Sequence, residues 1–393
     1  MKPSFDPRPT STIAETIARA LRAAGLSTQH ATHSSPVKSV TQTIRRALAA
    51  AGLTSVAAPN PPGGADGGVI DVKMREVPTP LDRAAPAPPT TATGTFVTHS
   101  FSNPAGTRAY KLYRPARAMP GRAPLIVMLH GCTQSPDDFA AGTQMNRLAD
   151  EQGFFVVYPA QGASDNPSKC WNWFSARDQR RDRGEPSLIA GIAREVASQH
   201  AVDPQRIFVA GLSAGAAMAV IVGETYPELF AGVGVHSGLP YAAASDLGSA
   251  LAAMKGGKGL AASIAQQPAA LAHAVPTIVF HGDRDHTVQA VNGEQIAEQA
   301  RAAHVAAGAA GGASQDGLVT QLETGRTAQG RRFSRNVQAD RQGRAVVEAW
   351  LLHGAGHAWS GGDPSGSYTD ATGPNASAEM VRFFFSQPVR AAV

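Results

Sequence analysis

The sequence has little cysteine, no long apolar run and no recognisable leader segment. Only 2 of 393 residues are cysteine, which excludes a disulfide-dense secreted scaffold and allows at most one intrachain bridge. No stretch of about 18 consecutive apolar residues occurs, so no membrane span is expected. The first 30 residues lack a basic segment followed by an apolar one, so no ordinary signal peptide is expected either.

Strong charge of one sign is also absent. The net charge is +5, and residues 1–90 hold 10 Lys/Arg against 6 Asp/Glu, which leaves only +1 for the remainder. Arg/Lys clusters interleaved with aromatic residues are not found, and a solvated basic tail accounts for the charge. We therefore expect no nucleic-acid partner. The hydrophobic content of 43% is enough for one large domain with an appendage.

The N-terminal part is poor in aromatic residues, with Phe5 as the single one among the first 95 residues. Here Thr16–Leu26 is repeated as Thr43–Leu53, 27 positions later, with nine of eleven residues identical. Helical spacing of apolar residues and a capping box before each copy predict two short amphipathic helices within residues 1–58. These helices either pack, on each other or on the main domain, or dock on a polymer surface or granule. Residues 59–94 are rich in Pro, Gly and Ala, which predicts a linker.

Residues 95–388 alternate short apolar segments with helical stretches, a pattern typical of the α/β class with a mostly parallel sheet flanked by helices. The runs are nearly continuously apolar, as expected for strands that are buried on both faces. The predicted strands are a hairpin of Thr95–Phe101 and Arg108–Arg114, followed by Leu125–Leu129, Phe154–Tyr158, Ile207–Ala210, Gly232–Val235, Thr277–Phe280 and Val346–Leu352.

The pentapeptide Gly211–Gly215 has Ser213 at its centre. It follows the predicted strand Ile207–Ala210 and precedes the apolar helical stretch Ala216–Thr225, which is the strand, sharp turn and helix of a nucleophile elbow. A side chain at either glycine would crowd so tight a turn. We therefore predict that Ser213 is a nucleophile, and the alternative is a structural Gly/Ser turn.

A serine hydroxyl needs a general base, which is itself oriented by a carboxylate. Downstream, one predicted strand runs into Asp283 and Asp285, and the last strand runs into His353 and His357, both at the edge where an open α/β sheet places its ligands. We predict Asp285 as the acid, because its position places the side chain past the strand end, and expect Asp283 to cap the turn. We predict His357, in a Gly-x-Gly-His loop, as the base, and expect His353 to pack or cap.

Acyl transfer also requires amide donors for the developing oxyanion. The amide of Ala214 directly follows the nucleophile, and the amide of Cys132 lies in the segment after strand Leu125–Leu129. The His130-Gly pair before Cys132 is also compatible with a plain turn.

The two cysteines and the tryptophans leave alternatives open. Cys132 and Cys170 either form a bridge or are two buried free thiols in a reducing compartment. The indoles of Trp171, Trp173 and Trp359 are candidates for the wall of a substrate pocket, but aromatic residues at such density are equally typical of a core.

Taken in order, the segments LHGCTQ, CWNWF, RGEPSLI, GLSAGAAMA, SGLPY, FHGDRDHTV and HGAGHAWSGG resemble the polyhydroxybutyrate depolymerase family of esterases, and more distantly feruloyl and acetylxylan esterases. The resemblance spans about Thr95 to Phe385. It implies an α/β-hydrolase fold, hydrolysis of carboxylic esters, no cofactor and no metal. It places the nucleophile, acid, base and oxyanion amide on Ser213, Asp285, His357 and Cys132, and it implies that Cys132 and Cys170 are bridged.

The resemblance also implies a substrate, which is a polymer or oligomer of 3-hydroxybutyrate or a related hydroxyalkanoate, and an extracellular location. A feruloyl or acetylxylan esterase is the alternative enzyme, a noncatalytic polymer-granule binding protein the alternative of another class, and the cytoplasm the alternative location. The segment Arg301–Arg332 is expected to be an insertion of unknown role.

Overall fold

The computed structural model describes residues 75–76, 94–116, 121–256, 274–310 and 318–389. Its central feature is an eleven-stranded sheet in the order β1-β9-β10-β11-β8-β7-β6-β4-β5-β3-β2. These strands are β1 (Arg75–Glu76), β2 (Thr95–Asn103), β3 (Gly106–Arg114), β4 (Ala123–Leu129), β5 (Phe155–Pro159), β6 (Val202–Leu212), β7 (Gly232–His236), β8 (Thr277–Gly282), β9 (Val319–Arg326), β10 (Arg332–Ala339) and β11 (Ala345–Leu352).

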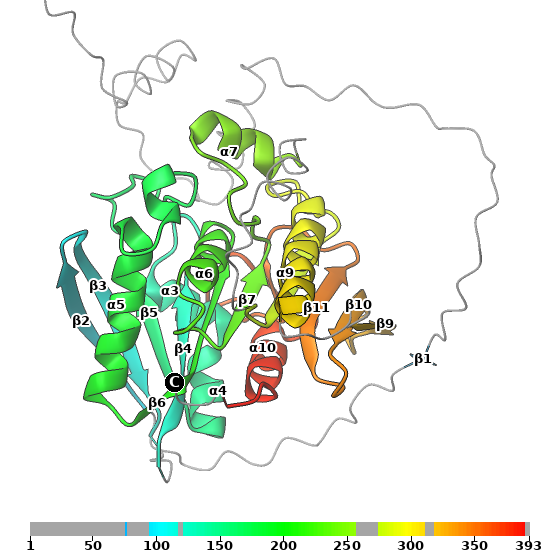
Figure 1. Cartoon of the computed structure of the whole chain (residues 1–393), viewed down its shortest axis with the longest axis horizontal. Helices are drawn as coiled ribbons and strands as arrows, with labels where there is room; N and C mark the ends of the chain where they lie inside the picture. Colours follow the sequence, from blue (N-terminus) through cyan, green and yellow to red (C-terminus); the bar gives the residue numbers. More distant parts are fainter. Residues whose placement is uncertain (1–74, 77–93, 117–120, 257–273, 311–317, 390–393) are drawn as a thin grey trace, which may run out of the picture. The chain divides into compact units, whose positions relative to one another are not determined.

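From β4 to β9 helices alternate with the strands along the chain, and helices cover the sheet (Figure 1). They are α3 (Pro136–Thr143), α4 (Met145–Gln152), α5 (Gly184–Gln199), α6 (Ala214–Thr225), α7 (Leu247–Met254), α9 (Val291–Ala310) and α10 (Ala376–Phe385), with the 3-10 turn η1 (Ala176–Gln179) before α5. Two short strands, β12 (Trp359–Ser360) and β13 (Thr369–Asp370), form a separate parallel pair.

The middle of the sheet is parallel, as predicted. Strands β11, β8, β7, β6, β4 and β5 run in one direction. The hairpin β2–β3 joins them through β3, which is antiparallel to β5, and the pair β9–β10 joins through β10, which is antiparallel to β11. Every residue of β4 is buried, because helices cover both faces of a parallel sheet. Each strand expected from an apolar run is present, and its ends lie within about two residues of the predicted ones, except that β6 begins at Val202, five residues before the predicted start at Ile207.

Alternate side chains of β4 enter two different cores. Leu125 and Val127 pack in the cluster that contains the buried residues of α5 and α6, whereas Ile126 packs in the cluster of α4 and α10. In the second cluster Phe384 of α10 stacks on Phe208 of β6, with ring centroids 4.8 Å apart. Full burial of one such large apolar side chain contributes about 1.5–3 kcal/mol to the free energy of unfolding. These two cores hold the strand ends that carry the candidate site.

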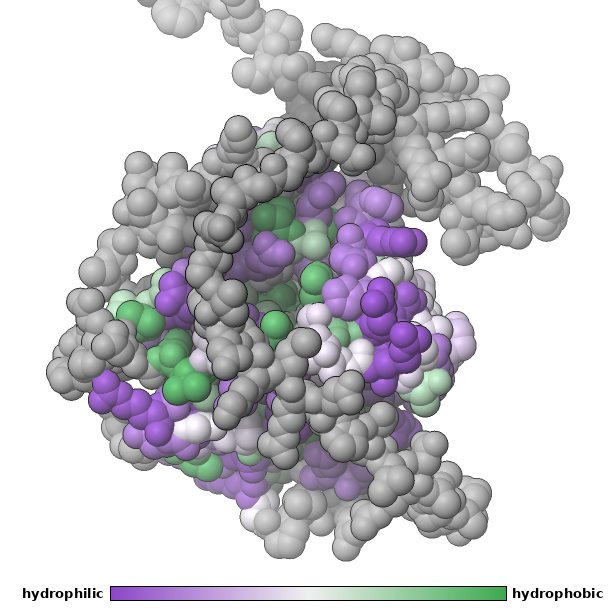
Figure 2. All heavy atoms as spheres, turned by 90° about the vertical axis from the view of Figure 1, so that its right-hand side faces the viewer, coloured by the Kyte–Doolittle hydropathy of each residue, from purple (hydrophilic) through white to green (hydrophobic). Residues whose placement is uncertain are grey.

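The described parts of the segment Arg301–Arg332, which was expected to be an insertion of unknown role, belong to a helix and a strand of the main fold. Helix α9 extends through it to Ala310, and β9 pairs antiparallel with β10 along its whole length. The strand β9 was not predicted, because its side chains are mostly exposed and polar and it has no apolar run. Its apolar residues Val319 and Leu322 are 57% and 39% exposed. Figure 2 looks onto this side of the molecule, where the described hydrophilic and hydrophobic side chains are mixed.

The repeat in residues 1–58 lies outside the described residues, as does most of the segment 59–94. The domain boundaries at residues 58 and 94 therefore stay predictions. Among the described residues, none of the helices has the length and apolar character needed to cross a membrane.

Candidate active site

Ser213 lies between β6 and α6 in a backbone conformation that L residues rarely adopt, with φ 58° and ψ −121°. Its N–H donates to the carbonyl of His236 at 2.9 Å. The turn is closed by small residues: a Cβ at Gly211 would lie 2.4 Å from the backbone of Gly215, and one at Gly215 would lie 2.1 Å from the carbonyl oxygen of Leu129. Backbone strain of this kind costs about 1–3 kcal/mol, and it is typical of functional sites.

His357 and Asp285 meet through a short hydrogen bond, with 2.6 Å between Nδ1 and Oδ2. The carboxylate of Asp285 is fully buried and also accepts the N–H groups of Thr287 and Val288, both at 2.9 Å. Burial acts to raise the pKa of Asp285, but the hydrogen bond and charge of His357 and the amide of Val288 outweigh it and lower the pKa below its ordinary value. The ionised carboxylate therefore holds the proton of the imidazole on Nδ1 and leaves Nε2 as the basic atom.

A second aspartate–histidine pair lies beside the first. Asp283 contacts Nδ1 of His353 at 3.1 Å and accepts the N–H of Gly354 at 2.6 Å, which is the turn-capping contact expected of it. The other ring nitrogen of His353 contacts the hydroxyl of Ser334 in β10 at 2.9 Å. Both ring nitrogens of His353 thus have partners within the fold. Asp285 pairs instead with His357, in the loop that follows His353.

The loop after β4 contacts the elbow directly. In the sheet, Leu129 of β4 pairs with Gly211 of β6, so the segments that follow the two strands emerge side by side. Cys132 is three residues beyond the first and Ser213 two beyond the second. The tight contact of Gly215 with Leu129 places the first turn of α6, including Ala214, against this loop. The two predicted oxyanion amides are therefore on neighbouring segments.

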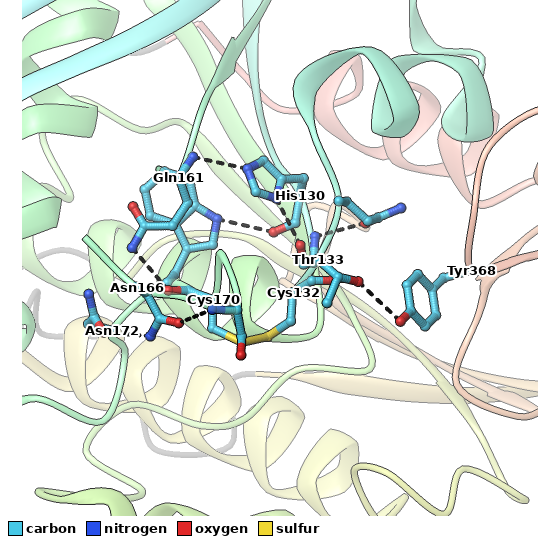
Figure 3. The surroundings of a disulfide bond; sticks show 12 residues. His130, Cys132, Thr133, Gln161, Asn166, Cys170, Asn172 and Tyr368 are labelled. Carbon is cyan, nitrogen blue, oxygen red and sulfur yellow. Dashed lines mark hydrogen bonds between the residues drawn. A yellow bond between two sulfur atoms is a disulfide. The ribbon is translucent and has the colours of Figure 1, made fainter. Parts of the chain in front are cut away.

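Cys132 and Cys170 form a disulfide, which decides between the two alternatives for these residues. Figure 3 shows that the bridge joins the loop after β4 to the segment that precedes Asn172. The N–H of Thr133 also donates to the carbonyl of Ser168 at 2.7 Å. The loop carrying Cys132 is thus held by a covalent bond and by a backbone hydrogen bond.

The three tryptophans, for which a pocket wall and a core position were equally open, are buried in the core. Trp171, Trp173 and Trp359 are 0%, 6% and 1% exposed. The indole N–H of Trp171 donates to the carbonyl of His130 at 3.1 Å, and that of Trp359 donates to the hydroxyl of Ser377 at 3.0 Å. Their accessible surface is too small to bind an acyl group. Their position indicates that they support the loops of the site from behind.

A buried polar network behind the disulfide was not predicted from the sequence. Glu185 at the start of α5 accepts the backbone N–H and the side-chain amide of Asn172, both at 2.8 Å, and the amide of Gln161 at 2.5 Å. The N–H of Gln161 in turn donates to Nε2 of His130 at 3.0 Å. Burial, and secondarily the charge of Asp178, raise the pKa of Glu185 to about 7. The segment RGEPSLI contains this glutamate, but nothing local in it indicates that the side chain is buried.

Glu185 makes stability depend on pH. Its pKa is about 7 in the folded chain against an ordinary 4.5, so the stability it contributes is complete below pH 4.5 and is lost as the pH rises to about 7. The full shift corresponds to at most about 3 kcal/mol of unfolding free energy. We expect the thermal midpoint of Glu185→Gln to fall less than that of the wild type between pH 5 and 8. The exposed Glu294→Gln serves as control, and parallel pH curves for wild type and Glu185→Gln would contradict the prediction.

His236 is a further buried group in contact with the site. Burial, together with the charges of His281 and His357, lowers its pKa to about 3, so the ring is neutral near neutral pH. Its Nε2 accepts the N–H of Ser360 at 3.0 Å, and its carbonyl accepts the N–H of Ser213. No group of three or more potential metal ligands occurs in the part of the chain that the structure describes.

The parallel sheet and the serine elbow define the class of this chain as an α/β-hydrolase. Residues 108–321 match the family described as Esterase PHB depolymerase. Because this match covers more than half of the chain, the chain belongs to that family, and the resemblance found from its motifs is confirmed.

Individual relatives agree with this assignment. The chain is 32% identical over 275 residues to poly(3-hydroxyalkanoate) depolymerase C of Paucimonas lemoignei, covering 67% of this chain and 61% of that protein, so it spans about three fifths of that relative's length. It is 35% identical over 147 residues to a probable acetylxylan esterase A of Aspergillus fumigatus, covering 37% of this chain and 38% of that one. The structure of an acetyl xylan esterase from Aspergillus awamori superposes with a TM-score of 0.56 at 19% identity, over 74% of this chain and 99% of that chain, and shows the shared fold.

Proposed function

We propose that this protein is a serine esterase in which Ser213 is the nucleophile, His357 the general base and Asp285 the residue that orients the base. The observation that carries the proposal is the 2.6 Å pair of His357 and the buried Asp285, which follow neighbouring parallel strands β11 and β8. Ser213 follows β6 at the same edge of the sheet. The same edge therefore carries a nucleophile, an acid and a base, in the order along the chain that α/β-hydrolases use.

In this mechanism the Oγ atom of Ser213 attacks the ester carbonyl carbon while Nε2 of His357 takes its proton. The resulting oxyanion accepts hydrogen bonds from the backbone N–H groups of Cys132 and Ala214. The carbon–oxygen bond of the leaving alcohol then breaks, and His357 returns the proton to that alcohol. A water molecule, deprotonated by the same histidine, attacks the carbonyl carbon of the acyl-enzyme. The bond from that carbon to Oγ of Ser213 then breaks, and His357 returns the proton to Oγ, which releases the acid and restores the free serine. Asp285 stabilises the charged imidazole in both halves of the reaction.

For the substrate we propose poly- or oligo(3-hydroxybutyrate) or a related hydroxyalkanoate ester. The family match and the relative named as a poly(3-hydroxyalkanoate) depolymerase support this choice. The second candidate is an acetylxylan or feruloyl ester, which the shorter match to an acetylxylan esterase favours. An esterase for either substrate class uses the same three residues, Ser213, His357 and Asp285. The two kinds of esterase differ only in the shape of the pockets for the acyl group and the alcohol.

The substrate is tested by product analysis. Purified protein is incubated with polyhydroxybutyrate, hydroxybutyrate oligomers, acetylated xylan and feruloylated xylan, with Ser213→Ala as the blank. We expect release of 3-hydroxybutyrate or its short oligomers at a rate well above that of acetate or ferulate. Release of acetate or ferulate alone would move the substrate to xylan esters. If the protein turns over none of these substrates and no p-nitrophenyl butyrate, the esterase proposal fails and the noncatalytic granule-binding hypothesis remains.

We further propose that residues 1–58 dock on a polymer surface and that the protein acts outside the cell. The repeat supports the first statement, because two weak apolar faces on one chain gain affinity for a repetitive surface through effective concentration. The disulfide supports the second, because such bonds persist in oxidising compartments.

A chain starting near Thr90 is expected to turn over soluble esters normally but to co-sediment less with polyhydroxybutyrate granules. Unchanged sedimentation with a lowered thermal midpoint would show that the helices belong to the fold.

A further inference from the structure

We infer that Gln134 is a positioning residue that aims the amide of Cys132 at the oxyanion and couples its loop to the loop of His357. The inference rests on the proposed esterase function. Gln134 is 2% exposed, and both ends of its carboxamide have partners. It lies two residues after Cys132, at the point where the loop after β4 turns toward α3.

The peptide unit between Gly131 and Cys132 is held by contacts to its carbonyl oxygen. Its carbonyl oxygen belongs to Gly131 and contacts Nδ1 of His130 at 2.8 Å and the N–H of Gln134 at 3.3 Å. Nε2 of the same imidazole accepts the N–H of Gln161, so the proton of this buried ring is on Nδ1. In a trans peptide the N–H points opposite to the C=O. The N–H of Cys132 is therefore directed away from His130 and Gln134.

The oxygen of the Gln134 carboxamide holds the preceding peptide unit as well. Oε1 accepts the N–H of Gly131 at 2.9 Å, so the side chain and the main chain of Gln134 both bind Gly131. Since Gly131 has no side chain of its own, rotation about its backbone is opposed mainly by these contacts. Loss of the carboxamide would remove the side-chain contact on the N–H of Gly131 and so loosen the backbone that leads into the peptide unit of Cys132.

The nitrogen of the carboxamide reaches a segment more than two hundred residues away in the sequence. Nε2 donates to the carbonyl and the hydroxyl of Ser367, at 3.1 and 3.2 Å, and to Oδ2 of Asp138 at 3.0 Å. Asp138 also accepts the N–H of Ser367 at 2.9 Å and its hydroxyl through a shorter contact. Gln134 and Asp138 together thus fix Ser367 against the loop after β4.

From Ser367 the connection continues to the loop of His357. The carbonyl of the next residue, Tyr368, accepts the N–H of Trp359 at 2.6 Å, two residues after His357. A second contact runs in parallel, because the Tyr368 hydroxyl lies 3.2 Å from that of Thr133, as Figure 3 shows. The loop after β4 and the loop of His357 are therefore joined through the buried carboxamide of Gln134 and the exposed side chain of Tyr368. Such joining preorganises both loops before an oxyanion forms.

The carboxamide is suited to this place because it accepts at one end and donates at the other. Gln134→Glu keeps the size but removes the donor and places a second carboxylate beside Asp138. Gln134→Met keeps most of the volume and removes both functions. The matched control is Gln299→Met in helix α9. Gln299 is also buried, and its carboxamide contacts both the N–H and the carbonyl of Tyr241.

The test uses the full chain and three measurements: kcat and KM on p-nitrophenyl butyrate, the inhibition constant of an alkyl trifluoromethyl ketone, and the thermal midpoint. The ketone forms a hemiketal oxyanion on the nucleophile and so reports on the amide donors. We expect both Gln134 variants to lower kcat by about 10–100-fold, below the full cost of one lost oxyanion donor, with KM within about threefold. The ketone should bind more weakly by the same factor as the loss in kcat/KM. Gln299→Met should lower the midpoint only.

Ser367→Ala is a second variant at an exposed position, where folding is not at risk. It removes one acceptor of the Gln134 amide, so kcat and ketone affinity should both fall by about three- to tenfold. Unchanged ketone affinity in Ser367→Ala and in the folded Gln134 variants, with only a lower thermal midpoint, would overturn the inference and make Gln134 merely structural. Failure of the esterase proposal is seen separately, as turnover that persists in Ser213→Ala.

Discussion

Alanine in place of Ser213 or His357 is expected to lower kcat for p-nitrophenyl butyrate by at least about 10⁴-fold, with the fold intact. Either change removes the acylation step, because without the serine no acyl-enzyme forms and without the base its hydroxyl stays protonated. The side chains of both residues are partly accessible, so their removal leaves no large cavity in the core. Circular dichroism and the thermal midpoint check the fold, and steady-state kinetics checks the activity.

His353→Ala is the matched control for His357→Ala. Both histidines follow β11 and each pairs with an aspartate, but the second ring nitrogen of His353 contacts Ser334 in the sheet. We expect this control to retain activity within about tenfold of wild type, as for a residue outside the triad. Activity within tenfold of wild type in Ser213→Ala or His357→Ala would refute the assignment of the nucleophile or the base.

Asp285→Asn is expected to lower kcat by about 10³–10⁴-fold, whereas Asp283→Asn should change it by less than about tenfold. Asparagine at 285 retains the shape but can turn an N–H toward the imidazole, which then carries its proton on Nε2 and cannot act as a base. At 283 an asparagine still has an oxygen to accept the N–H of Gly354, the contact that closes the turn. Each variant removes one negative charge from the wild type, so each serves as the control for the other.

The ranking of these two variants decides which aspartate is the acid. Equal losses would indicate that the two aspartate–histidine pairs act together, and the reverse ranking would move the acid to Asp283. The pH dependence of kcat/KM in Asp285→Asn gives an independent reading, because residual activity should rise toward alkaline pH as hydroxide replaces the missing base. A pH profile unchanged from wild type would argue against a role for Asp285 in orienting the base.

Local sequence was sufficient for much of the fold. The apolar runs that became β4, β7 and β8 are buried on both faces, so burial alone sets their composition and makes them visible without a partner. The spacing of Gly211 and Gly215 around Ser213 reflects close contacts within one turn and with β4. The positions of Asp285 and His357 follow from strand ends, because parallel strands bring their C-terminal ends to one edge of the sheet.

Other features depend on contacts between distant residues. The strand β9 has a polar, mostly exposed sequence and exists because β10 supplies its hydrogen bonds, so no pattern within the segment indicates it. The burial of Trp171 and Trp359 is set by the elements that enclose them. The sequence around a tryptophan in a loop does not indicate whether its side chain faces solvent or the core.

The sequence alone therefore established the class of fold, the serine elbow and the candidate aspartates and histidines, because each is encoded within one strand or turn. Only the tertiary structure decided that Asp285 pairs with His357 and Asp283 with His353, since the four residues lie on two loops and the pairing depends on how those loops pack. It also revealed the contacts of Gln134 with Ser367, which join residues 233 positions apart. Hydrogen bonds over such a separation depend on the packing of the whole sheet, which no local pattern records.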